Sequence, residues 1–386
     1  MNQIMDMLKR NSLLLALVVV MVLFEIAIRI SGHGSMFSPQ NFTNIISQNS
    51  YVIILAVGML FCIIGCGNID LSVGSLVALI GAVAGVIMVN NEGNVYMAIA
   101  ICLLLGILIG AWHGFWIAYV RIPSFIVTLA GMMLFRGIAL LVLDGLTISP
   151  FPPEYLRYFT SFIPKARNEA FTLTTIITVI LVAGYVLAVV YDRISKIRKN
   201  YEVESMSSFL FKLAIVVFAL VGSGLLLANN KGIPVILILL TVIVLFYAFV
   251  ANKTVTGRRL YALGGNEKAA KLSGVNTNRL LFLAYVNMGF LSAVAALVCL
   301  ARFNSAAPTA GNGYELDAIG ACFIGGASAY GGVGTVGGAV IGAVFMGVLN
   351  NGMSILGIDA NWQRTVKGLV LLLAVVIDVL SKKRSR

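Results

Sequence analysis

Residues 264–274 read Gly-Gly-Asn-Glu-Lys-Ala-Ala-Lys-Leu-Ser-Gly and form the middle of a polar segment, 251–279, which separates two long apolar runs. Asn266 can cap the start of a helix, Glu267 suits the positive end of the helix dipole, and Gly274 can close the last turn. The sequence therefore predicts a short helix bracketed by glycines. A capped helix is more structure than a connector needs, which indicates a surface that a partner grips.

The composition of the whole chain indicates a membrane protein. Hydrophobic residues make up 60% of the 386 residues, charged residues make up 11%, and the mean hydropathy is +0.98. Soluble domains carry about 25% charged residues. We therefore expect one all-α polytopic membrane domain over 1–386, with about 10–12 transmembrane segments. The candidate spans are 12–30, 45–66, 71–89, 95–120, 124–143, 171–191, 209–228, 232–250, 280–303, 314–330, 336–357 and 363–380.

The distribution of basic residues predicts the topology. The net charge is +12, and most Lys and Arg residues fall in short loops and at the two ends of the chain. Such clusters mark the cytoplasmic side, so the charge does not indicate a nucleic-acid partner. We expect a multi-pass protein of a bacterial plasma (inner) membrane with both termini in the cytoplasm. The predicted cytoplasmic parts are Lys9, Arg10, Arg121, the loop 192–208, the polar segment 251–279 and the tail 382–386.

The cysteines do not indicate a metal site. Cys62 and Cys66 have helical spacing, but no neighbouring His or acidic residue completes a ligand set. The other three, Cys102, Cys299 and Cys322, also lie in apolar segments. The expectation is buried thiols and no metal or cofactor on this chain.

Two candidate spans follow or contain polar breaks. Asn68 and Asp70 precede the span 71–89, and Glu315 and Asp317 lie at the start of 314–330. Broken or half-length helices at membrane depth are tolerated where they line a cavity or are buried in protein, and transporters place substrate pathways there. Both breaks have an acid followed by small residues, which hints at an internal repeat. We expect Asp70 to cap the helix that begins near Leu71.

Glycines are dense over residues 325–338. Small residues let helices approach closely, so this region is predicted to pack tightly in the centre of the bundle. No Gly-Lys-Ser/Thr sequence follows it, so these glycines do not indicate a nucleotide site.

Four motifs together resemble the membrane permease subunits of bacterial monosaccharide ABC importers, the ribose/xylose/galactose group. They are Asn68-Ile-Asp-Leu-Ser-Val-Gly-Ser75; Ile122-Pro-Ser-Phe-Ile-Val-Thr-Leu129 with Arg136-Gly137; Thr256-Gly-Arg258 through the 264–274 helix; and Gly313-Tyr-Glu-Leu-Asp-Ala-Ile319 through Asn350-Asn-Gly352 to Lys367-Gly368. The resemblance covers about 40–150 and 230–380. The segment 159–229, an inserted pair of spans with the loop 192–208, is similar to the longer xylose or multiple-monosaccharide permeases.

The resemblance implies an ABC importer permease fold and a role as a transport subunit, not an enzyme. It identifies residues 251–279 as the coupling loop to a separate ATPase subunit, which would hold ATP and Mg²⁺. The expected partners are that ATPase, an extracytoplasmic sugar-binding protein, a second copy of the chain in a homodimer, and membrane lipid. The matching coupling residues are Gly265, Glu267, Ala269, Ala270 and Gly274.

The substrate pathway is predicted from the chemistry of neutral sugars, which amide, hydroxyl and aromatic groups bind. Asn68, Asp70, Phe125, Asn350 and Asn351 are the pathway candidates. Arg136 and Lys367 are expected to extend toward the interface or to pair with acids. An ion-coupled secondary transporter of a small polar solute stays open as the alternative, because Asp70, Glu315 and Asp317 could form its ion site.

Overall fold

The computed structural model describes residues 12–164, 167–201, 203 and 205–385, and it is almost entirely helical. Ten helices of the described part are long and apolar enough to cross a membrane, which confirms the predicted all-α polytopic class. Lys9 and Arg10, on which the prediction for the N-terminus depends, lie outside the described residues. The helices of the first half are α2 (Ser12–Ile30), α3 (Pro39–Cys66), α4 (Val73–Gly85) with the π-helical turn η1 (Val86–Asn90), α5 (Val95–Gly114) with η2 (Phe115–Tyr119), α6 (Ser124–Leu143) and α7 (Pro153–Thr160).

The second half contains the remaining helices and a short pair of strands. These elements are β1 (Phe162–Ile163), α8 (Arg167–Arg198), α9 (Met206–Ala228), β2 (Ile233–Pro234), α10 (Val235–Lys253), α11 (Val255–Gly265), α12 (Glu267–Leu272), α13 (Thr277–Phe303), α14 (Tyr314–Ile324), α15 (Val336–Ile355) and α16 (Ala360–Ser385). The predicted span 314–330 is an 11-residue helix, α14, followed by a loop. At about 1.5 Å per residue this helix is too short to cross a bilayer by itself, as expected for a half-length helix. The predicted span 363–380 lies within α16.

The chain divides into two compact units, each described separately here. The first contains residues 1–34, 45–160 and 236–386. Its tightest packing is between α5 and α13, where glycines let the backbones meet. A Cβ on Gly110 would overlap the carbonyl oxygen of Tyr285, and one on Gly289 would overlap that of Gly106. Such contact is how membrane helices gain packing energy where lipid is as apolar as the helix surface.

The two predicted breaks lie against each other in the first unit. A Cβ on Gly74, in the first turn of α4, would overlap the carbonyl oxygen of Gly311, just before α14. The same Cβ would lie 2.5 Å from Oε2 of Glu315. The sequence predicts both breaks but not that they touch.

The second unit contains residues 35–44 and 161–235. The helices α8 and α9, which make up most of the inserted segment 159–229, pack side by side, with Gly224 against Thr178. The short antiparallel pair β1–β2 closes the base of this hairpin. The connection between α8 and α9 is shorter than the predicted loop 192–208, because α8 continues to Arg198 and α9 starts at Met206.

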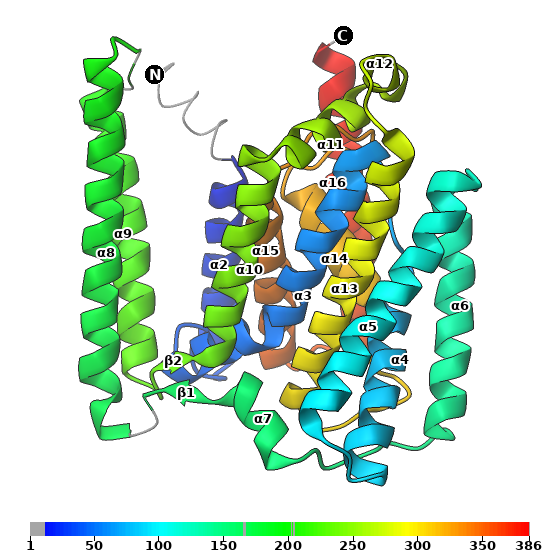
Figure 1. The fold of residues 1–386 in the computed structure, drawn as a ribbon. Coiled ribbons are helices and arrows are strands. Elements are labelled where there is room, and N and C mark those ends of the chain that lie inside the picture. The colour runs from blue at the N-terminus through cyan, green and yellow to red at the C-terminus, as the bar shows by residue number, and fades with distance from the viewer. Residues whose placement is uncertain (1–11, 165–166, 202, 204, 386) are drawn as a thin grey trace. The chain divides into compact units, whose positions relative to one another are not determined.

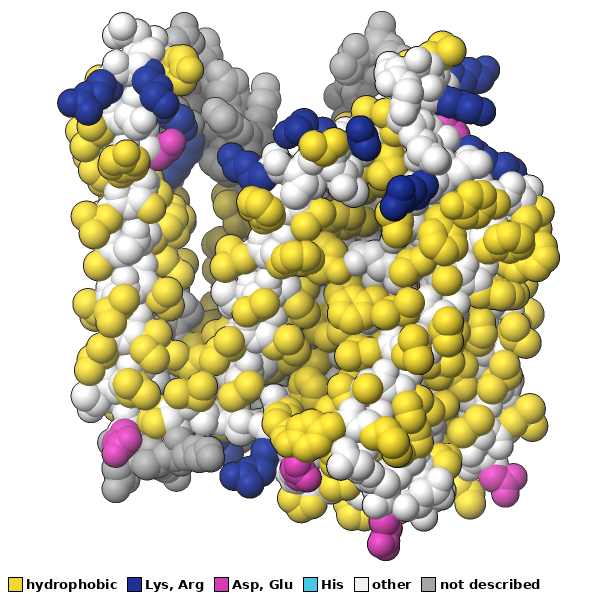
Figure 2. All heavy atoms as spheres, viewed as in Figure 1, with side chains coloured by type: hydrophobic (Ala, Val, Ile, Leu, Met, Phe, Trp, Pro, Cys, Tyr) yellow, Lys and Arg dark blue, Asp and Glu magenta, His cyan; other side chains and the backbone are white. Residues whose placement is uncertain are grey.

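Charge is unevenly distributed over the first unit. Figure 2 shows Lys and Arg side chains at the end of this unit where α11 and α12 lie (Figure 1), whereas the band between the two ends is mostly hydrophobic on the face drawn. All six basic residues of the polar segment are exposed: Lys253, Arg258, Arg259, Lys268, Lys271 and Arg279. This pattern is the one that membrane topology rules associate with a cytoplasmic surface.

Candidate functional site

The polar segment begins with α11, which lies on the rest of the first unit. Thr254 caps this helix, because its Oγ1 accepts a hydrogen bond from the Gly257 amide at 3.2 Å. Leu260 and Leu263 are buried, so one side of the helix faces the protein and the other faces solvent. The helix is therefore anchored on a packed face and does not hang free.

The end of α11 contacts the glycine-rich loop between α14 and α15. A Cβ on Gly264 would overlap both the Ile64 carbonyl oxygen and the Gly332 amide nitrogen. The Gly332 amide itself donates to the Ile64 carbonyl at 2.9 Å, and the Tyr261 hydroxyl donates to the Gly334 carbonyl at 2.7 Å. Close packing of glycines in 325–338 is thus confirmed, but the contact is with α11 at one end of the unit and not in the centre of the bundle, and Tyr330 and Val333 of this segment are exposed.

Helix α12 has the caps that the sequence predicts. Asn266 Oδ1 accepts from the Ala269 amide at 3.0 Å, and Glu267 occupies the first turn. Gly274 has φ +80°, a left-handed conformation that glycine adopts without strain. The amides of Gly274 and Val275 donate to the carbonyls of the last turn at 3.0 and 3.1 Å, which closes the helix.

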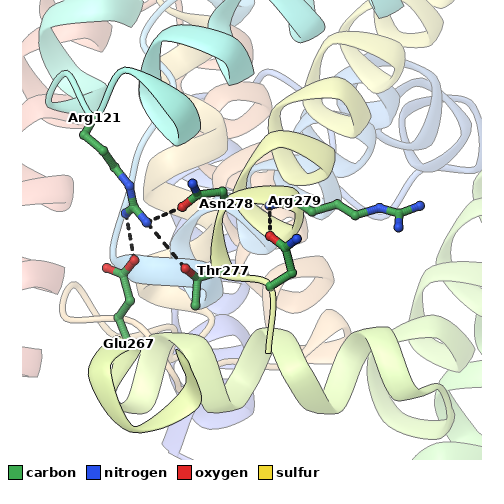
Figure 3. A network of polar contacts seen from close by, with 6 residues as sticks. Arg121, Glu267, Thr277, Asn278 and Arg279 are labelled. Carbon is green, nitrogen blue, oxygen red and sulfur yellow. Dashed lines mark hydrogen bonds and ion pairs between the residues drawn. The ribbon is translucent and has the colours of Figure 1, made fainter. Parts of the chain in front are cut away.

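Glu267 forms an ion pair with Arg121, a residue of the connection between α5 and α6. The distance from Nη1 of Arg121 to Oε1 of Glu267 is 2.7 Å, and Figure 3 shows the guanidinium pointing also toward Thr277 and Asn278. Its Nη2 donates to the Thr277 hydroxyl at 3.4 Å and to the Asn278 side-chain oxygen. Arg121 thus ties α12 to the start of α13.

This ion pair fixes the position of α12 against α13 more than it contributes to the free energy of folding. The two side chains are 42% and 37% exposed, and pairs of this kind contribute about 0–1 kcal/mol. Arg121 has φ +67°, an uncommon conformation for a non-glycine residue. A strained residue held by three acceptors indicates that the position of its side chain matters.

The outward face of α12 and its flanking residues carry several small residues and one large apolar side chain. Leu272 is 90% exposed, and Gly265, Ala269 and Gly274 are also at the surface. Ala270, by contrast, is buried and packs inward. Of the five predicted coupling residues, Ala270 and Glu267 therefore hold the helix in place, whereas the other three lie on the free surface.

Comparison with family models gives a match over most of the chain. A family model described as "branched-chain amino acid transport system / permease component" matches residues 41–171 and 157–375. The chain belongs to this family.

Individual relatives of this permease extend over most of its length. It is 40% identical over 372 residues to the xylose transport system permease protein XylH of Haemophilus influenzae, which covers 96% of each chain. It is 39% identical over 355 residues to XylH of Escherichia coli strain K12, covering 91% of this chain and 88% of the relative. The ribose import permease protein RbsC of the same strain is 36% identical over 363 residues, covering 94% and 92%. No solved structure matches the permease. The resemblance predicted from the four motifs is confirmed.

The predicted pathway residues lie in two places in the permease. Asn68 and Asp70 are in the non-helical stretch before α4, where the Ser124 hydroxyl donates to Asn68 Oδ1 at 3.2 Å. Phe125, the next residue along α6, is 53% exposed. These three form one neighbourhood, whereas Asn350 and Asn351 are buried on α15, which packs against α2 and α14 and also contacts Asn49 of α3. Which of the five contact substrate stays a prediction.

The expectation that Asp70 caps the helix beginning near Leu71 is wrong in position, since α4 begins at Val73 and Ser72, two residues after Asp70, is its N-cap residue. Asp70 is 1% exposed, and its Oδ1 accepts from the amide and the hydroxyl of Ser72 at 2.8 and 2.6 Å. Ser72 is itself the residue that precedes the first helical residue, Val73. The carboxylate therefore organises the start of α4 through Ser72.

Lys367 pairs with an acid, as expected. Its Nζ lies 2.9 Å from Oδ1 of Asp317, which is 1% exposed, and the Tyr51 hydroxyl donates to Oδ2 at 2.9 Å. Arg136 differs from the expectation: it donates to the carbonyl oxygens of Pro308 and Ala310 at 3.1 and 2.6 Å. Asp317, one of the acids that an ion-coupled carrier would use, is thus committed to a structural pair.

Metal ligands do not come together in the described part of the permease. No group of three or more His, Cys, Asp or Glu residues that could hold a metal ion occurs there. The five cysteines are free thiols, four of them buried.

Proposed function

We propose that this chain is the membrane-spanning subunit of an ATP-driven ABC importer that moves a monosaccharide into the cell, with xylose as the first candidate. The alignments of this chain with relatives named as xylose permeases cover 88–96% of the length of those relatives, at 39–40% identity. The ribose permease follows at 36%. We rank xylose before ribose as the substrate because the identity to the xylose permeases is higher. The inserted segment 159–229, which resembles the longer xylose-type permeases, agrees with this ranking.

The observation that carries the mechanism is the geometry of α12. A short capped helix on the basic surface presents Leu272, which is 90% exposed, and in our proposal this side chain enters a pocket of the partner. In our proposal, the ATPase subunit grips this helix, ATP and Mg²⁺ bind to the ATPase alone, and its closure moves α12. Gly265, Ala269 and Gly274 allow the close approach, while Glu267 and Ala270 hold α12 to the permease.

Two copies of the chain are part of the proposal. One coupling helix per chain and a motor with two ATP sites require a permease homodimer, with the sugar passing near the two-fold axis. An extracytoplasmic binding protein delivers the sugar on the side opposite α12. Both termini and residues 251–279 then face the cytoplasm, and the basic surface of Figure 2 supports this orientation.

Reconstitution tests the function directly. The chain is purified with its candidate ATPase and binding protein, and ATP hydrolysis is measured with the binding protein loaded with different pentoses and hexoses. Xylose is expected to give the largest stimulation. Equal rates with and without every sugar would contradict the proposal.

A pair of variants tests the coupling helix itself. Leu272→Asp is expected to abolish stimulated hydrolysis, because a charge replaces the proposed anchor. Val255→Asp is the matched control: Val255 is also an exposed apolar residue of the polar segment, 50% exposed, but it begins α11. Equal effects of the two variants would show that α12 is not the docking element.

Labelling of single cysteines tests the orientation. Cysteines placed at Ser273 and Ser385 are expected to react with a membrane-impermeant reagent only after the cells are opened. Reaction of either in intact cells would contradict a cytoplasmic placement of both sites.

A further inference from the structure

A cavity of about 460 Å³ opens on the first unit between α6, α14 and α16. Its wall is mostly apolar but also carries two guanidinium groups, a carboxylate and an amide. The lining includes Met132, Met133, Arg136, Asn312, Glu315 and Arg364.

The cavity lies toward the end of the first unit opposite α12. Arg136 is twelve residues into α6, about 18 Å along a helix of about 30 Å, and Arg364 is four residues, about 6 Å, into α16. Ionisable groups within a membrane-spanning helix are costly against lipid and almost always face a water-filled path or another protein surface. The wall of this cavity is therefore not expected to face acyl chains.

Two of the charged groups of the cavity, Arg136 and Glu315, are held in place. Nη1 of Arg136 donates to the carbonyls of Pro308 and Ala310, which fixes the loop that precedes α14. Glu315 is in the first turn of α14, where the helix dipole favours a carboxylate, and its Oε2 lies against Gly74 of α4. Asn312 is exposed beside it. Two fixed groups and two exposed ones, Asn312 and Arg364, thus place hydrogen-bond donors and acceptors around an open space.

We infer that this cavity is a sugar-contacting station on the translocation path, where Glu315, Asn312 and Arg364 exchange hydrogen bonds with the hydroxyl groups of a neutral monosaccharide. Arg136 is a positioning residue, since it holds the loop and balances the charge of Glu315. A second copy of the chain closes the open side. The inference rests on the proposed import function and names the residues through which it works.

Accessibility to water is the first test. Met133→Cys, on the cavity wall, and Leu134→Cys, at the same depth but turned about 100° around α6, are treated with a membrane-impermeant thiol reagent in the assembled transporter. The two native side chains are 67% and 47% exposed. The cysteine at 133 is expected to react about ten-fold faster, or more, than the one at 134, in line with the cost of polar groups in lipid. The unmodified protein, with its native cysteines, gives the baseline. Equal rates would overturn the inference.

Recognition of hydroxyl groups is the second test. Transport of xylose and of deoxy analogues that each lack one hydroxyl is compared in the unmodified transporter and in Glu315→Gln. The same binding protein serves both, so a change in the ratio between sugars belongs to the permease. The penalty for one missing hydroxyl is expected to shrink by about ten-fold in the variant, as for a lost charged hydrogen bond. Asn312→Ala, at an exposed loop position, gives the same comparison if Glu315→Gln does not insert.

The control separates this inference from the proposed function. Glu154→Gln removes an exposed carboxylate of α7 that does not line the cavity, and it is expected to keep the ratios of the unmodified transporter. If the unmodified transporter moves no sugar, the import function fails. If it moves sugar and the Glu315 and Asn312 variants show unchanged ratios, the cavity is not part of the path and the inference alone fails.

Discussion

The polar segment and the pair of broken helices are both interruptions of the apolar pattern, but different kinds of interaction hold them. Helix α12 is closed by residues next to it in sequence, Asn266 at its start and Gly274 after its end. The breaks before α4 and α14 are held by partners far away: Gly74 meets Gly311, and Asp317 pairs with Lys367. Because neighbouring residues cap α12, its outer face stays free for a partner. The breaks before α4 and α14, by contrast, are packed into the core by residues that are distant in sequence. The four predictions that follow test this difference, from the largest expected effect to the smallest.

Replacing Gly264 should give the largest loss. A Cβ at Gly264 would overlap backbone atoms of Ile64 and Gly332, so Gly264→Ala forces two chain segments apart and is expected to cost more than about 3 kcal/mol. Gly265→Ala is the control, because no atom lies within 4 Å of its added Cβ. Thermal unfolding in detergent, followed by size-exclusion chromatography, measures both. Similar stability of the two variants would contradict the packing of α11 on the glycine loop.

The Asp317–Lys367 pair should show strong coupling. Lys367→Met leaves the buried Asp317 charge unpaired and is expected to lower the free energy of unfolding by about 3 kcal/mol. Asp317→Asn with Lys367→Met removes both charges and should recover a large part of that loss, which a double-mutant cycle measures. Additive losses would show that the two side chains do not act as a pair.

Gly274 should affect coupling more than folding. Its φ of +80° strains any β-branched residue, so Gly274→Val is expected to cost about 1–3 kcal/mol locally and to open the last turn of α12. Gly274→Asn is the control, since Asn tolerates this conformation. We expect both single variants to insert normally. Sugar-stimulated ATP hydrolysis should be kept in Gly274→Asn and lost in Gly274→Val. It should also be lost in the double variant Glu267→Lys, Gly274→Val. Transport by that double variant at the unmodified rate would remove α12 as the coupling element.

The Arg121–Glu267 pair should have the smallest effect on stability. Each charge reversal, Arg121→Glu or Glu267→Lys, is expected to change the free energy of unfolding by less than about 1 kcal/mol, because the pair is half exposed. Stimulated ATP hydrolysis should fall in each single variant and recover in the double reversal, which restores the opposite charges. Failure of the double reversal to recover would show that Glu267 acts through another group.

The sequence predicted what adjacent residues determine. The all-α class and its membrane-length helices follow from composition, and the caps of α12 follow from the order of Asn266, Glu267 and Gly274. One error was also local: α4 starts at Val73, two positions beyond the predicted start at Leu71, and Asp70 bonds to Ser72 and not to the helix amides.

Contacts between distant residues were beyond the reach of the sequence. Arg121 is 146 residues from Glu267, and nothing in an Arg residue specifies which acid it will meet. The glycines of 325–338 predict close packing but not that the partner is α11. The cavity of Arg136 and Glu315 joins three helices, so neither residue marks it alone. Single residues predicted to line the pathway could not be grouped for the same reason.

The contact between Arg121 and Glu267 links the proposed ATPase-docking helix α12 to the start of α6. Arg121 precedes α6 by only Ile122 and Pro123, and the ring of Pro123 restricts the backbone there. A displacement of α12 by the ATPase therefore reaches the first turn of α6 with little slack. Arg136, about 18 Å along the same helix, holds the carbonyls of Pro308 and Ala310, so a movement of α6 would also pull on the loop before α14 that borders the cavity. One half-exposed salt bridge would thereby pass a push at the surface to the wall of the cavity.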